Sequence, residues 1–218
     1  MPAPKPKAAI TAPRLPKTAL PPAILPRDLP IDGETCSHLE YQQLDLAGKA
    51  LSRPHFEETI FVQLSAAESH FQDLRMEDVR LSACNLANAN WPGVACARVE
   101  FTSCLMTGFT TMNARFIDTV FRDCKMDLAQ FYQASFQGVR FETCPLTGVD
   151  FRDSDLTGVV FTHCDLTSAD FRGATLRGAD IRGCTIEGMR AGPTELHGAT
   201  VDEAQALALI RAMGITIA

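Results

Sequence analysis

Hydrophobic residues recur at every fifth position through most of this chain, and this period restricts the possible folds more than any other feature. Thirty successive positions at that spacing run from Phe56 to Val201, only Thr111 among them is polar, and twelve of the 13 phenylalanines lie on this register. A helix of period 3.6 or a strand of period 2 cannot keep every fifth residue on one side. A chain that turns a corner every five residues can, so we predict a coiled backbone with these residues inside.

Two further columns follow the same period. A small or β-branched residue, such as Ala129 or Val139, usually stands two places before the large residue, and a glycine, such as Gly173, often stands two places after it. Glycine adopts backbone angles that other residues resist. We therefore place the corners of the coil at the glycine column.

Residues 169–183 read ADFRG, ATLRG and ADIRG. These segments resemble the A(D/N)LXX consensus of the pentapeptide repeat family, and the resemblance extends over about residues 39–201. It implies an all-β fold, a right-handed quadrilateral parallel β-helix with four pentapeptides in each coil.

The spacing of six cysteines predicts the same coil length. They follow one another at intervals of 20 residues: Cys84, Cys104, Cys124, Cys144, Cys164 and Cys184. The repeat region therefore holds about eight coils of 20 residues. Stacked coils would place these thiols about 4.8 Å apart, whereas a disulfide needs Cβ atoms about 3.8 Å apart.

These cysteines form no Cys-x-x-Cys pair of the kind found in zinc sites. We expect reduced thiols that fill space in the core, consistent with a reducing cytoplasm, and no metal. The alternative, a redox ladder, has no exposed low-pKa partner to support it. We expect only Cys36, which precedes the repeat, to be accessible.

The charge distribution divides the chain into three parts. Residues 1–30 hold nine of the 13 prolines and five basic residues against one acid, which leaves a charge of −10 on the remainder of a chain of net charge −6. Such a proline-rich segment is typical of a disordered tail, either a solvated leader or a basic peptide that docks on a partner. Residues 31–201 then form the β-helix with its N-terminal cap, and residues 202–218 form a C-terminal helix.

The C-terminal segment is predicted to cover the open end of the last coil, because unpaired backbone edges invite aggregation. Acidic residues begin it, Arg211 and Gly214 suit its end, and an apolar stripe runs along it. The family resemblance implies that such a helix also joins two chains end to end. We therefore predict a homodimer with candidate contacts at Leu209, Ile210 and Met213.

The sequence favours no catalytic chemistry. The five histidines, His38, His55, His70, His163 and His197, form no ligand or triad spacing, and no glycine-rich phosphate loop is present. An uninterrupted coil leaves no long loops in which to assemble an active site. We expect a protein that is not an enzyme, with no cofactor. We also predict no membrane span, because no apolar run has the necessary length.

Two functions remain open. The first is a scaffold that binds a partner protein, with the outward apolar residues Ile60, Val120 and Val160 as one possible contact. The second is implied by the resemblance: some family members act on DNA gyrase as DNA mimics and protect it from quinolones or toxins. For that function the candidate acidic face comprises Asp150, Asp153, Asp155, Asp165 and Asp170. The net negative charge argues against direct nucleic-acid binding in either case.

Overall fold

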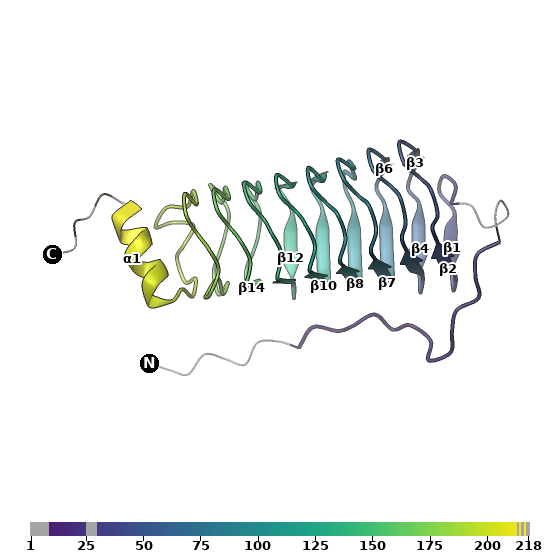
Figure 1. The fold of residues 1–218 in the computed structure, drawn as a ribbon, viewed down its shortest axis with the longest axis horizontal. Coiled ribbons are helices and arrows are strands. Elements are labelled where there is room, and N and C mark those ends of the chain that lie inside the picture. The colour runs from purple at the N-terminus through teal and green to yellow at the C-terminus, as the bar shows by residue number, and fades with distance from the viewer. Residues whose placement is uncertain (1–8, 25–29, 213, 215, 217–218) are drawn as a thin grey trace.

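The chain forms a rod of stacked coils, closed at one end by a helix (Figure 1). A computed structural model describes residues 9–24, 30–212, 214 and 216. The helix is α1 (Glu203–Ala212). Within the described residues the strands are β1 (Thr35–Ser37), β2 (Glu40–Gln42), β3 (Ala50–Ser52), β4 (His55–Glu57), β5 (Ile60–Val62), β6 (His70–Gln72), β7 (Arg75–Ser82), β8 (Ala95–Thr102), β9 (Thr110–Met112), β10 (Arg115–Arg122), β11 (Gln130–Tyr132), β12 (Ser135–Gln137), β13 (Arg140–Glu142) and β14 (Val160–Thr162).

All paired strands are parallel, and paired residues are 20 positions apart, as with Cys36 and Phe56. The predicted β-helix with 20-residue coils is confirmed. The main strand path, β1-β4-β7-β8-β10-β13-β14, makes about six turns rather than the predicted eight. The difference arises beyond β14, where pairing continues only as single bridges such as Asp165 to Thr185 and Asp180 to Thr200.

The corners lie where the sequence predicted them, two residues after each buried centre. Glycines there have positive φ, for example 74° at Gly173, and many corners close with a hydrogen bond across the turn, as from Ala174 N to Phe171 O at 2.9 Å. Residues other than glycine also adopt positive φ at corners, including Leu128 at 58°. Stacked neighbouring coils hydrogen-bond to these corners and hold them in a conformation that isolated residues avoid.

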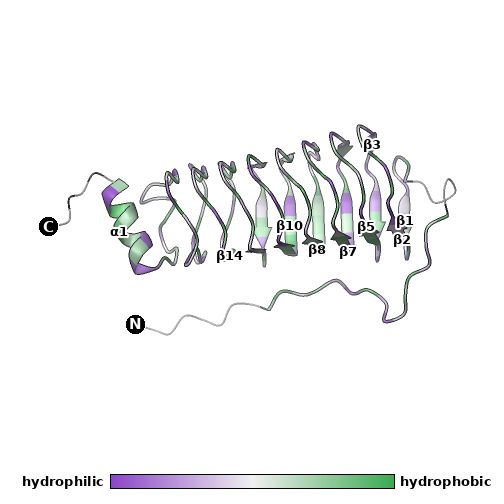
Figure 2. Cartoon of the chain, viewed as in Figure 1, coloured by the Kyte–Doolittle hydropathy of each residue, from purple (hydrophilic) through white to green (hydrophobic). Residues whose placement is uncertain are grey.

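The core consists of columns of identical or similar side chains. Phe101, Phe121, Phe141 and Phe161 form one column whose ring centroids lie 4.8, 4.9 and 5.0 Å apart in sequence order. In Figure 2 hydrophobic and hydrophilic residues alternate along the coils, as expected for a core lined by every fifth residue and the small residue two places before it. The one polar centre, Thr111, donates a hydrogen bond to the carbonyl oxygen of Trp91 at 2.8 Å.

The six cysteines of the ladder are buried, and their thiols form no disulfides. Each ladder thiol donates to backbone carbonyl oxygens, as Cys124 does to Arg122 at 3.3 Å and to Phe101 at 3.5 Å. A hydrogen bond with the Cys124 thiol, together with burial, raises the pKa of Cys104 to about 12. Burial likewise raises the pKa of Cys96. The Cys104 and Cys96 thiols therefore remain protonated, and the ladder fills space in the core.

The N-terminal segment differs from the predicted disordered tail over residues 9–24, which run alongside the rod (Figure 1). Ala23 N donates to Glu40 O and Glu40 N donates to Pro21 O, both at 2.9 Å, so this segment covers the exposed edge of β2. Leu20 is buried, and Arg14 N donates to the Asp78 carboxylate at 2.7 Å. An unpaired strand edge and one apolar anchor are enough to fix this proline-rich segment. Residues 1–8 and 25–29 of the predicted tail lie outside the described residues.

The helix α1 covers the last coil, as predicted for the C-terminal segment. Asp202 and Gln205 form a reciprocal cap: Gln205 N donates to the Asp202 carboxylate, and Asp202 N donates to the Gln205 amide oxygen, both at 2.9 Å. The Gln205 amide nitrogen also donates to the carbonyl oxygens of Ile181 and Cys184 at 2.7 and 2.8 Å. One buried side chain thus starts the helix and satisfies two carbonyl groups at the open end of the coil. Among the described residues no helix is long and apolar enough to span a membrane.

Candidate interaction surfaces

The outer surface of the rod is built from rows of side chains that run along its axis. The residues immediately before and after each buried centre point outward, and each lies beside the residue 20 positions away in the next coil. One such row contains Ile60, Val120 and Val160. The ion pair of Arg80 with Glu100 at 3.1 Å separates the first two, so the three do not form a continuous apolar strip.

The five aspartates predicted as an acidic face do not share a face. Asp150 and Asp170 are neighbours in one row, whereas Asp155 and Asp165 stand in the rows of Thr175 and Thr185. Asp153 occupies a corner with a φ of 57°. The five residues therefore do not form one flat face, because residues one pentapeptide apart, such as Asp150 and Asp155, lie on adjacent sides of a four-sided coil.

Arginines neutralise the two aspartates that do stack. Arg152 pairs with Asp150 and Arg172 pairs with Asp170, each at 2.7 Å, and Arg190 approaches Asp170 at 3.4 Å. The hydrogen bond from Arg172 is the main reason that the pKa of Asp170 lies below its usual value. In an Asp-x-Arg segment both charged side chains flank one buried centre and point the same way. This side of the rod therefore lacks the uncompensated negative field of a DNA mimic.

Asp165 is held by a different set of contacts. The Thr167 hydroxyl and backbone N–H, with the Thr147 hydroxyl, hydrogen-bond its carboxylate and lower its pKa. Asp155 similarly accepts a hydrogen bond from Thr157 N at 3.0 Å. These carboxylates fix local turns of the backbone, which is a structural role that their sequence positions alone did not reveal.

The predicted dimer residues of α1 have different positions. Leu209 packs against the core and, with Ile186 and Met189, lines a small hollow of about 180 Å³ between the helix and the last coil. Ile210 is half-buried, and Met213 lies outside the described residues. Leu209 thus belongs to the contact between α1 and the last coil. The dimer contact stays a prediction.

Three exposed hydrophobic residues lie at one corner of the rod and on the two sides that meet there, and they were not singled out in the sequence. Leu128 is 62% exposed, Met112 is 49% exposed and Leu105 is 38% exposed. Gly108 N donates to Asp127 O at 2.9 Å, so Gly108 and Leu128 are successive residues of the same corner, and Leu105 and Met112 flank Gly108 in the chain. We call these three residues the apolar edge. Tyr132, the neighbour of Met112 in the next coil, stacks against the guanidinium of Arg152 at 5.8 Å.

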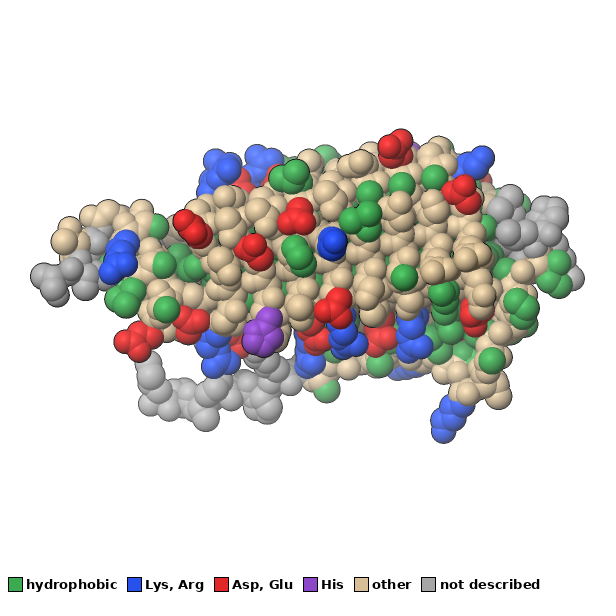
Figure 3. All heavy atoms as spheres, viewed as in Figure 1, with side chains coloured by type: hydrophobic (Ala, Val, Ile, Leu, Met, Phe, Trp, Pro, Cys, Tyr) green, Lys and Arg blue, Asp and Glu red, His purple; other side chains and the backbone are tan. Residues whose placement is uncertain are grey.

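Charged side chains are distributed unevenly around the rod. Figure 3 shows one side on which uncharged atoms predominate, with scattered charged side chains across its middle and more of them toward its upper and lower borders. Across the described residues no three His, Cys, Asp or Glu side chains are placed to hold a metal ion.

One family model matches the repeat region of the chain. Residues 94–166 and 114–191 match the family model described as the pentapeptide repeat region. The chain is similar in structure to a trypsin-treated form of QnrB1, a plasmid-mediated fluoroquinolone resistance protein, at 15% identity and a TM-score of 0.35, covering 86% of this chain and 92% of that one.

A second similar structure is HetL, a pentapeptide repeat protein involved in heterocyst differentiation regulation from the cyanobacterium Nostoc sp. strain PCC 7120. It is 20% identical with a TM-score of 0.29, covering 79% of this chain and 91% of that one. Rfr23 from the cyanobacterium Cyanothece 51142 is 13% identical with a TM-score of 0.19, covering 75% and 88% of the two chains. No curated protein sequence matches the chain.

Proposed function

The chain belongs to the pentapeptide repeat family, and from that premise we propose that it is a non-enzymatic cytoplasmic scaffold whose rod binds a partner protein. A rigid stack of coils presents side chains in fixed rows, so a partner meets a surface that loses little conformational entropy on binding. The buried, free thiols of the cysteine ladder support a reducing compartment.

The apolar edge is the observation that carries this proposal. Leu128 exposes a large hydrophobic side chain at a corner with positive φ, a conformation that disfavours leucine. Gly108 occupies the same corner one coil earlier without this cost. A large apolar side chain that is exposed at a corner lowers solubility and is explained if a partner covers it, and exposed apolar groups ringed by polar ones are typical of protein contacts.

The test is a comparison of partner capture by the intact chain and by two variants in source-cell extract, followed by titration of each captured protein in purified form. Leu128→Asn removes the apolar group and keeps a residue that tolerates positive φ. Val62→Thr changes an outward residue of β5 in another row and serves as the control. We expect Leu128→Asn to lose a partner that Val62→Thr retains, with both melting temperatures near that of the parent. Equal binding by Leu128→Asn would contradict a role for the apolar edge.

The alternative function is a DNA-mimicking modulator of DNA gyrase or topoisomerase that protects it from quinolones or toxins. The charge of −10 outside residues 1–30 favours it. The dispersal of the aspartates and their pairing with arginines weigh against it.

A supercoiling assay with purified gyrase, with and without quinolone, separates the two functions. The scaffold proposal expects no change in either condition. Protection of gyrase that disappears when Asp150, Asp153 and Asp155 are changed to lysine would replace the scaffold with the alternative.

A further inference from the structure

Three arginines without carboxylate partners line one side of the rod near its N-terminal end. Among the described residues, the arginines that form ion pairs are Arg80, Arg98, Arg122, Arg152, Arg172, Arg182 and Arg190. Arg53, Arg75 and Arg115 form none, and all three border two adjoining hollows of the surface. In a chain of net charge −6, a local excess of unpaired guanidinium groups needs an explanation.

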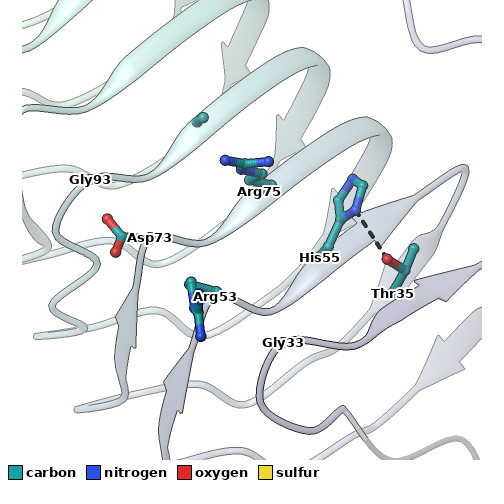
Figure 4. A pocket seen from close by; sticks show the side chains of 8 residues that line it. Gly33, Thr35, Arg53, His55, Asp73, Arg75 and Gly93 are labelled. Carbon is teal, nitrogen blue, oxygen red and sulfur yellow. Dashed lines mark hydrogen bonds between the residues drawn. The ribbon is translucent and has the colours of Figure 1, made fainter.

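The strand register places these side chains next to one another. His55, Arg75, Ala95 and Arg115 are successive neighbours in one row, so Arg75 and Arg115 are two strand spacings apart, about 10 Å between their backbones. Arg53 reaches the same hollow from the adjacent corner (Figure 4). The first hollow has a volume of about 570 Å³ and is lined by Gly33, Thr35, Arg53, His55, Asp73, Arg75, Gly93 and Ala95.

Small residues create this hollow. Gly33 and Gly93 turn corners with φ of 70° and add no side chain, and Ala95 interrupts the row of long side chains between Arg75 and Arg115. Figure 4 shows Arg53, Arg75 and His55 around the space between these two glycines. The Thr35 hydroxyl lies 3.2 Å from His55 Nδ1 and fixes the imidazole ring at the rim.

The balance of charge in the two hollows is positive. Asp73 is the one carboxylate lining the first hollow. Glu77 borders the second hollow but is bound by Arg98. Three arginines thus face a single unpaired carboxylate.

We call the two adjoining hollows the groove. We propose that the groove binds a small, multiply charged phosphate anion of the pyrophosphate class. Guanidinium groups donate paired hydrogen bonds to phosphate oxygens, and a volume of about 570 Å³ is within the range of small-molecule sites. Arginines at two points along the groove suit an anion whose charge is spread over more than one centre. A long polyanion such as nucleic acid is disfavoured, because the rest of the rod is acidic.

The experiment is calorimetric titration of the full chain with inorganic pyrophosphate at low ionic strength. Arg75→Gln and Arg53→Asn each remove one guanidinium, the latter with a residue suited to the positive φ of that corner. Arg140→Gln is the matched control, because Arg140 also forms no ion pair within the described residues but stands in the row of Val120 and Val160. Ala95→Leu fills the groove and leaves every charge in place.

We expect Arg75→Gln and Arg53→Asn each to weaken pyrophosphate binding about tenfold, in line with the loss of a charge-assisted hydrogen bond. Ala95→Leu should weaken binding at least as much, and Arg140→Gln should change it less than twofold. Full binding by Ala95→Leu, or equal weakening by Arg140→Gln, would show diffuse attraction and overturn the proposal.

Two further results also decide the matter. Absence of any pyrophosphate binding by the parent chain would overturn the proposal, and so would binding of citrate as tightly as pyrophosphate. If a peptide binds the parent chain only when it is phosphorylated, and does not bind Ala95→Leu, the groove recognises phosphate. The source of that phosphate would then be a peptide. The groove is separate from the apolar edge. If the groove does not bind pyrophosphate, the proposed scaffold function therefore still stands.

Discussion

Single residues in this rod are constrained by their neighbours in the adjacent coils more than by their own preferences. Glu58, Asp118 and Leu128 all hold positive φ at corners, a conformation usually left to glycine. Each corner repeats at the next coil, where backbone hydrogen bonds such as Leu128 N to Thr147 O at 2.9 Å fix it. The cost of each unfavourable residue is therefore offset by the stack.

At this scale the clearest prediction concerns Phe121, which is fully buried between Phe101 and Phe141. Phe121→Asp should destabilise the protein by more than about 5 kcal/mol, because it removes a large core side chain and buries an unpaired carboxylate. The neighbouring control, Val120→Asp, places the same charge at an outward position and should cost about 1 kcal/mol or less. Urea unfolding followed by circular dichroism measures both. Similar losses in the two variants would contradict the assigned register.

Among the elements, the helix α1 shows how a solenoid end is closed. Its buried residue is polar: Gln205 satisfies carbonyl groups of the last coil, while Leu207 faces solvent. The apolar stripe in the sequence therefore predicts that a helix forms here. It does not predict that Gln205 makes the main contact between this helix and the last coil. The end of the rod is closed by hydrogen bonds as well as by hydrophobic packing.

We predict that Gln205→Ala will destabilise the protein by about 2–3 kcal/mol, because two buried carbonyl groups lose their donor. Glu203→Ala, at an exposed position of the same helix, is the control and should change stability by less than about 0.5 kcal/mol. Hydrogen exchange at residues 181–184 should accelerate in Gln205→Ala alone. Unchanged exchange there would show that the helix closes the coil by other contacts.

The cap also predicts a dependence on pH. Hydrogen bonds from the backbone N–H groups of Gln205 and Gly183 hold the pKa of Asp202 below its usual value of 3.8. A folded-state pKa below the unfolded one means that the stabilisation is present above about pH 4 and is lost as the pH falls through the folded pKa. Asp202→Asn should thus lower the melting temperature at pH 7, and its difference from the parent should shrink toward pH 3. A constant difference would contradict this.

For the whole molecule, the open question is whether two rods join end to end through α1. Leu207 is exposed and Ile210 is half-buried, whereas Leu209 packs against the core at the last coil. We predict that the intact chain sediments as a dimer, that Ile210→Gln shifts it to monomer without unfolding, and that deletion of residues 202–218 yields monomer or aggregate. Sedimentation velocity distinguishes these states. If the intact chain sediments as a monomer, the predicted dimer is wrong.

The amino-acid sequence by itself determined the coil. A five-residue period and cysteines at 20-residue intervals are repeated so often that one conformation satisfies all of them. The same arithmetic could have separated Asp150 from Asp155, since consecutive pentapeptides occupy adjacent sides. The Asp202 to Gln205 spacing of a helix cap was also legible in the sequence.

Some contacts in this molecule are not encoded in the five-residue period, and only the tertiary structure decided them. The docking of residues 9–24 on β2 and Asp78 depends on an edge and a carboxylate that are distant in sequence. The groove exists because Gly33, Gly93 and Ala95 leave space beside arginines from different coils. The contacts of Gln205 join a helix to carbonyl groups more than 20 residues earlier. Such pairings are set by where the coils place groups in space, and no local preference of the chain specifies them.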